Sequence, residues 1–198
     1  MKIHGICSYL GKNYSGWQKQ IDFPSIQEEI EIVLSKVLNT ETNIQGSGRT
    51  DAGVHALNQH FHFEVNKEVD LNRLMYSLNS MLPDDILIKN LIAVDDDFHA
   101  RFSAKGKEYK YLISKDTKDP FKTDTYWLMP VPFDDQLFED ALKLFVGTHN
   151  FKNFTSKEED EAGFKRKVNI ELKTNDNIVT IDFYGNGFMK YMIQRKLI

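Results

Sequence analysis

The sequence predicts an α+β protein made of two ferredoxin-like halves, each following the element order βαββαβ. Segments with strand and helix patterns succeed one another in this order through the first half of the chain, and the same order begins again in the second half. Of the 198 residues, 41% are hydrophobic and 27% are charged, which is typical of a globular protein rather than a disordered one. We place the two halves at residues 1–97 and 98–198.

The first half contains all six expected elements. An apolar strand over residues 2–10 precedes a helix that begins at Ser25, where Ser25 and Glu28 fit a capping box. Strands follow at residues 42–48 and 58–65, and the second of these alternates strictly between apolar and polar residues. Asp70 is a suitable cap for a second helix, which ends before Pro83 and is followed by a strand over residues 85–94.

The second half repeats this order but is incomplete. We predict a strand over residues 107–114, a helix over 134–146 that Gly147 ends, and a hairpin of strands 167–174 and 177–185. The last residues, "GFMKYMIQRKLI", begin a helix. The closing strand of the second half is therefore missing, and we expect this half to be weakened.

Composition and charge exclude several classes of protein. A formal net charge of −4 argues against a protein that binds nucleic acid through bulk charge, although basic residues gather locally in "RFSAKGKEYKY", "FKRKV" and "QRK". Cys7 is the single cysteine, so neither an internal disulfide nor a cysteine-based zinc site can form. The apolar runs are too short to span a membrane, and the N-terminus has no signal-peptide pattern. We expect a cytoplasmic protein without a membrane association.

The stretch "GSGRTDAGVHA", residues 46–56, is the strongest candidate for a site. Its carboxylate, Asp51, suits a nucleophile, a general base, a metal ligand or a plain turn residue. Three glycines in one loop exceed what a hairpin turn requires, and on an extended backbone Arg49 and Asp51 point the same way. The loop matches neither of the common glycine-rich phosphate motifs.

Two further patterns leave alternatives open. His60, His62 and Glu64 share one face of a predicted strand, with His55 nearby, which suits either a metal site or the polar face of a half-buried strand. Lys107, Tyr109 and Tyr111 likewise share a face, as in an ordinary amphipathic strand or in a surface on which a base stacks beside a cation. Tyr14 and Trp17, in a polar loop, suit recognition or a buried anchor.

The loop 46–56 closely resembles the signature loop of the TruA-type tRNA pseudouridine synthases. Further stretches agree in the family's order along nearly the whole chain: "YSGWQKQ", "SIQEEIE", "LPDDILI", "FHARFSAKGKEYKY", "GTHNFKNFT" and "GNGFMKYM". The resemblance implies isomerisation of uridine to pseudouridine in the tRNA anticodon stem-loop, at positions 38–40. It also implies a homodimer that needs no metal and no cofactor, with the two sheets side by side and a central catalytic cleft.

The resemblance also assigns roles to residues. Asp51 matches the catalytic aspartate, Arg49 the arginine that helps to turn out the target uridine, and Tyr109 the tyrosine that packs against the target base. Lys107 and Arg101 are expected to bind substrate through their positive charge. The remaining expected residues support the loop: Gly48, Thr50, Gly53 and His55.

The chain departs from the family pattern near its end. Gln194 stands where the family has arginine, Arg195 follows one place later, and family members continue for several dozen residues. Two alternatives to the isomerase therefore stay open. One is a tRNA-binding protein that keeps the fold without catalysis, and the other is a small metallohydrolase that uses the histidine-rich strand.

Overall fold

The computed structural model describes all residues except 117, 130–133, 157, 159–162 and 194–198. The chain forms two compact units, Met1–Ala104 and Lys105–Ile198, each with its own sheet and its own hydrophobic core. No helix in the described part of the chain is long and apolar enough to cross a membrane.

The first unit has the predicted order β1 (Lys2–Tyr9), α1 (Ile26–Leu38), β2 (Gln45–Gly46), β3 (Ala56–Glu64), α2 (Leu71–Asn79) and β4 (Ile86–Val94). The strands form a four-stranded sheet in the order β2-β3-β1-β4, and each strand pairs antiparallel with its neighbours. This is the ferredoxin-like arrangement, with β1 and β3 in the centre. The strand predicted over residues 42–48 shrinks to the two residues of β2.

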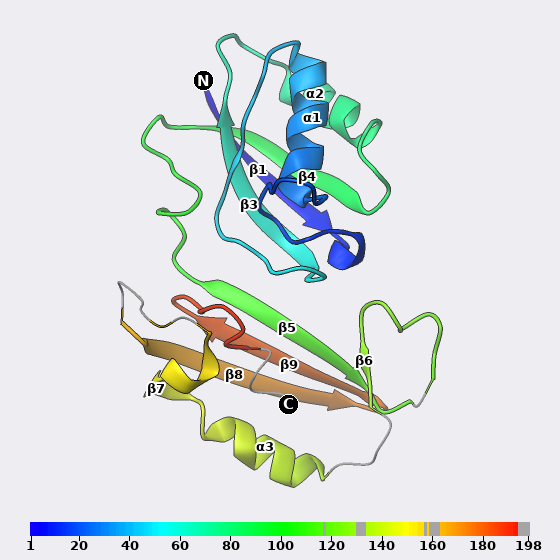
Figure 1. Cartoon of the computed structure of the whole chain (residues 1–198), viewed down its shortest axis with the longest axis vertical. Coiled ribbons are helices and arrows are strands. Elements are labelled where there is room, and N and C mark those ends of the chain that lie inside the picture. Colours follow the sequence, from blue (N-terminus) through cyan, green and yellow to red (C-terminus); the bar gives the residue numbers. More distant parts are fainter. Residues whose placement is uncertain (117, 130–133, 157, 159–162, 194–198) are drawn as a thin grey trace. The chain divides into compact units, whose positions relative to one another are not determined.

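Both helices of the first unit begin at the caps that the sequence predicts. The Ser25 hydroxyl accepts a hydrogen bond from the Glu28 N–H at 3.3 Å, and the Asp70 carboxylate accepts from the N–H groups of residues 72 and 73. The helices lie on one face of the sheet (Figure 1). Ile26, Ile30 and Leu34 are buried in the same hydrophobic core as Phe61 of β3.

The second unit contains β5 (Lys107–Ser114), β6 (Trp127–Leu128), α3 (Asp135–Lys143), β7 (Gly147–Asn150), β8 (Lys165–Asn175) and β9 (Ile178–Gly185). They form a five-stranded sheet in the order β6-β5-β9-β8-β7 (Figure 1). The predicted hairpin is present as β8 and β9, and its turn places Asp176 at a φ of +49°.

The second unit differs from the prediction in three respects. The sheet is mixed rather than antiparallel, because β6 runs parallel to β5 along two residue pairs. The strands β6 and β7 were not predicted, since segments of two and four residues are too short for an alternating pattern. The helix predicted to extend to residue 146 ends at Lys143, and Gly147, at a φ of +109°, opens β7.

The end of the chain is described only in part. Residues 190–193 form turns rather than the start of a helix, and Met189, Met192 and Ile193 are buried in the core of the second unit. Gln194 and Arg195 lie outside the described residues. Among the described residues, β6 is the strand that pairs with β5 on the side away from β9.

Candidate active-site loop

The loop that joins β2 to β3 carries the two residues singled out by the sequence. Arg49 is exposed and Asp51 is half-buried. Within the described residues, neither side chain makes a hydrogen bond or an ion pair, whereas the backbone around them is held at several points. The loop therefore carries one cation and one carboxylate that no side-chain hydrogen bond or ion pair engages within the described residues.

The backbone of this loop is seated against the segment that follows β1. The Thr50 carbonyl accepts a hydrogen bond from the Trp17 N–H at 3.2 Å, and the Tyr14 carbonyl accepts one from the Gly53 N–H at 3.3 Å. The Val54 N–H closes the loop on the Asp51 carbonyl at 3.2 Å. Backbone hydrogen bonds thus join the segment after β1 to the loop between β2 and β3, although neither forms a regular β-strand there.

Side chains add further supports. The Gln59 amide donates to the Gly48 carbonyl at 2.6 Å, and Gln59 is itself buried. The Gly11 N–H donates to Nδ1 of His55 at 3.0 Å, so the proton of a neutral His55 ring sits on Nε2. The hydroxyls of Tyr9 and Thr50 lie 3.0 Å apart.

Glycines permit the close approach of the two segments. A Cβ atom on Gly16 would lie 2.4 Å from the Thr50 carbonyl oxygen, and one on Gly11 would lie 2.1 Å from the Val54 carbonyl oxygen. A Cβ atom on Gly46 would lie 2.5 Å from the Trp17 ring. Gly53 has a different reason to be glycine, because its φ of +78° is in the region that other residues rarely adopt.

The structure resolves one alternative and adds residues that the sequence did not indicate. Tyr14 and Trp17 are buried anchors, with exposed fractions of 8% and 1%. Tyr9, Gln59, Gly11 and Gly16 support the loop, although the sequence assigned no role to any of them. Local sequence patterns could not identify this role, because each of these residues acts through a contact with a residue distant in sequence.

The expected substrate-binding residues lie elsewhere in the chain. Arg101 is exposed in the segment after β4 and stands 5.8 Å from the Phe102 ring. Lys107 and Tyr109 belong to β5 in the second unit, where both are half-buried. Tyr109 packs on the edge of Phe188, with ring centroids 5.1 Å apart, and the neighbouring Lys110 pairs with the buried Asp182.

The histidine-rich strand forms a stacked aromatic cluster. The rings of His4 and His60 stack with their nitrogens 2.8 Å apart, and Phe98 packs against His4. His62 accepts a hydrogen bond from the Ala100 N–H, which ties the segment after β4 to this face of the sheet. Among the described residues, no three histidine, cysteine or acidic side chains are grouped so that they could hold a metal ion. The metallohydrolase alternative therefore has no support from the described residues.

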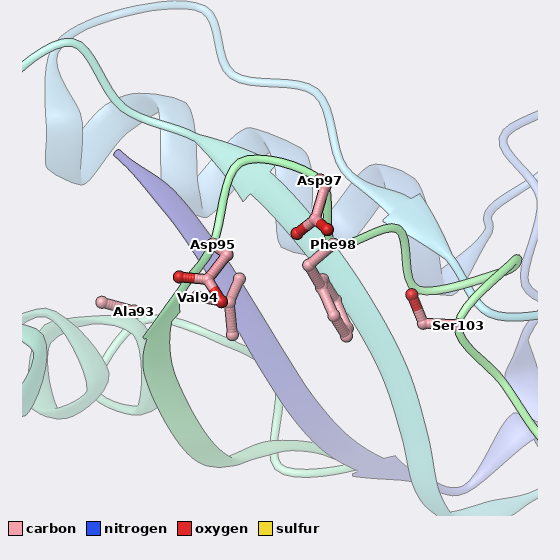
Figure 2. Close-up of a pocket in the computed structure, with 6 residues that line it drawn as sticks. All are labelled: Ala93, Val94, Asp95, Asp97, Phe98 and Ser103. Carbon is pink, nitrogen blue, oxygen red and sulfur yellow. The ribbon is translucent and has the colours of Figure 1, made fainter.

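A shallow hollow of about 530 Å³ lies beside this cluster, at the end of β4 (Figure 2). Its lining residues are Ala93, Val94, Asp95, Asp97, Phe98 and Ser103. None of the residues with an expected role in the reaction lines it.

Comparison with known proteins gives a consistent picture. A family model described as tRNA pseudouridine synthase matches residues 6–103 and 141–197. A protein of Thermoanaerobacter sp. named tRNA pseudouridine synthase A is 35% identical over 191 residues, covering 96% of this chain and 78% of the relative. Proteins of the same name from Mycoplasma genitalium and Staphylococcus aureus are 35% and 34% identical, and cover 78% and 74% of those relatives.

Proposed function

The chain belongs to the tRNA pseudouridine synthase family, and from this membership we propose that Asp51 is the catalytic carboxylate of an isomerase acting on the tRNA anticodon stem-loop. The conversion of uridine to pseudouridine in tRNA follows from the family. The choice of Asp51, and of positions 38–40 as targets, is our proposal. The observation that carries it is the seating of the loop, which fixes the backbone on both sides of Asp51 and leaves its carboxylate unpaired among the described residues.

The reaction rearranges one nucleotide without a net gain or loss of atoms. The N1–C1′ bond breaks, the uracil turns, and a C5–C1′ bond forms. The proton leaves C5, and N1 gains one. No oxidant, reductant or co-reactant is needed, so the chain's own side chains can supply the chemistry.

Asp51 has three roles that fit this chemistry. Its carboxylate attacks C1′ of the sugar, attacks C6 of the base, or removes a proton from the sugar. Each role requires an ionised carboxylate that is held at a fixed distance from the extruded nucleotide.

The target uridine must leave the base stack before it can react, which takes a few kcal/mol. We assign Arg49 to this step, because a planar and exposed guanidinium can occupy the space that the base vacates. Tyr109 supplies an aromatic face for the extruded base, and Lys107 and Arg101 supply charge for the RNA backbone. We further propose a cytoplasmic homodimer.

The test of this proposal is the variant Asp51→Asn. It removes the charge at almost constant volume, so single-turnover conversion of a tRNA transcript should fall to background while the Kd for tRNA stays within a few-fold. Tritium release from [5-³H]uridine-labelled tRNA reports turnover, since the C5 hydrogen is lost. Asp84→Asn, at an exposed turn position of the same unit, controls for the change in net charge.

The outcomes separate the alternatives. Appreciable turnover by Asp51→Asn contradicts the assignment of the carboxylate. A wild-type chain that binds tRNA without converting any uridine supports the binding-only alternative. Conversion confined to positions other than 38–40 contradicts the proposed target.

A further inference from the structure

Tyr9 is a buried tyrosine whose hydroxyl reaches the candidate active-site loop. It is the last residue of β1, its exposed fraction is 3%, and its hydroxyl lies 3.0 Å from Oγ1 of Thr50. Thr50 is the residue immediately before Asp51. Buried hydroxyls are normally hydrogen-bonded, so this contact persists in the folded protein.

The contact begins on the most firmly held strand of the first unit. β1 pairs with β3 on one side and with β4 on the other, and Tyr9 itself is in register with Ala56 and Ile86. Groups carried by strands are positioned more precisely than groups carried by loops. The Tyr9 hydroxyl is therefore a fixed reference point against which a loop can be aligned.

Thr50 is held at two atoms by two different segments. Its hydroxyl meets Tyr9, and its carbonyl accepts a hydrogen bond from the Trp17 N–H. One hydrogen bond leaves a residue free to rotate about the bond axis, whereas two directions of contact fix its orientation. Thr50 lies between Arg49 and Asp51, so these two contacts also hold the backbone on which both charged residues stand.

We propose that Tyr9 is a positioning residue for the reaction, which acts through its hydrogen bond to Thr50 to fix the direction in which the Asp51 carboxylate points. This inference rests on the proposed function. Tyr9 does not touch the substrate. Its contribution is to the rate of the chemical step and not to the affinity for tRNA.

The first test is the variant Tyr9→Phe, which removes one oxygen and keeps the ring. A displacement of about 1 Å at a reacting group lowers the rate about 100-fold, so we expect a loss of roughly 10- to 100-fold in the single-turnover rate constant. The Kd for tRNA should change less than about twofold. A loss confined to tRNA affinity would overturn the proposal.

The partner residue supplies a rescue experiment. Thr50→Val removes the other hydroxyl at nearly constant shape and should match Tyr9→Phe, whereas Thr50→Ser keeps the hydroxyl and should stay near the wild-type rate. The double variant Tyr9→Phe with Thr50→Val should lose little more than either single variant, because both delete one interaction. Fully multiplicative losses would overturn the proposal.

A merely structural role is excluded by a matched control. Ser35 also carries a hydroxyl with a partly buried hydrogen bond, accepted from the Thr42 N–H at 2.9 Å, and contacts no residue of the loop. Ser35→Ala should lower the Tm by an amount similar to Tyr9→Phe and leave the rate constant unchanged. Equal losses of rate in the two variants would show that general destabilisation explains both.

Hydrogen–deuterium exchange separates this inference from the proposed function, since it needs no turnover. In Tyr9→Phe the peptide spanning residues 46–56 should exchange faster, while peptides from α1 and α2 stay unchanged. Faster exchange together with an inactive wild-type chain would leave the seating of the loop intact and count against the proposed function. Unchanged exchange and an unchanged rate, with an active wild-type chain, would overturn the role of Tyr9 alone.

Discussion

Replacement of Gly16 by alanine should move the candidate active-site loop, although no residue of the loop itself is substituted. Gly16 has a φ of +97°, which residues other than glycine rarely adopt. The added Cβ would lie 2.4 Å from the Thr50 carbonyl oxygen and 3.1 Å from the Asp51 carbonyl carbon. Both atoms belong to the backbone, so no flexible side chain can yield.

The magnitude follows from these distances. Ordinary contact begins at 3.4 Å, so the Thr50 carbonyl must retreat by about 3.4 − 2.4 = 1.0 Å. A displacement of about 1 Å lowers the rate of a positioned reaction about 100-fold. The strained backbone adds roughly 1–3 kcal/mol of destabilisation, and each kcal/mol lowers the Tm by roughly 2–4 °C for a chain of this size.

The control for strain is Gly163→Ala. Gly163 also has a positive φ, +67°, but a Cβ there would have no atom of the described residues within 4 Å. Both variants should therefore lower the Tm by a few degrees, whereas only Gly16→Ala should lose about 100-fold in single-turnover pseudouridine formation. If the two variants keep the same rate, the position of the loop backbone does not limit the reaction and the reasoning is wrong.

Two more predictions follow from the packing of each unit. Tyr109→Phe should lower activity less than Tyr109→Ala, because Phe keeps the aromatic ring and stacking on one base is worth about 1–3 kcal/mol. Tyr111→Ala, on the same face of β5, controls for the loss of core packing. Equal losses of activity in the two Tyr109 variants would point to the hydroxyl instead. Burial lowers the pKa values of His4, His60 and His62 below the ordinary value of about 6.5. The positive charge of neighbouring groups lowers two of them further: His60 acts on the pKa of His4, and His99 and Lys2 act on that of His62. Glu64 and a hydrogen bond with the backbone of Gln45 raise the pKa of His62 and so oppose part of its shift. The unfolded chain then binds more protons than the folded one at mildly acidic pH, so the free energy of unfolding should be highest above about pH 6.5 and should fall as the pH drops through the lowered pKa values of these histidines. Denaturant titrations at several pH values check this. His60→Gln should make the free energy of unfolding depend less on pH.

Local signals in the sequence were sufficient for most of the first unit. The caps at Ser25 and Asp70 begin the two helices as predicted, and the alternation of Phe61 and Phe63 marks the buried face of β3. These signals act within a few residues of one another, so a single sequence contains them. The two-residue strand β6 and the four-residue strand β7 carry no such signal, because pairing with a neighbouring strand defines them.

The candidate site shows the same division. The density of glycine around Arg49 and Asp51 marks the loop, and the positive φ of Gly53 agrees with one reason for that density. The supports of the loop could not be found in this way. Gln59 is one residue of an alternating strand, and Gly16 is one glycine in a polar connection, until the fold brings them to Gly48 and Thr50.

All the contacts described here that seat the loop come from the first unit. Tyr9, Gly16 and Trp17 precede the loop in the sequence and Gln59 follows it, and each lies within Met1–Ala104. The proposed role of the Asp51 carboxylate therefore depends on the fold of the first unit, whereas Tyr109 and Lys107 belong to β5 of the second unit. Under the proposed roles, changes in the core of the second unit should weaken base binding through Tyr109, and changes around β1 should lower the rate of the chemical step. A substitution that impairs one of these two properties, base binding or the rate of the chemical step, should leave the other measurable.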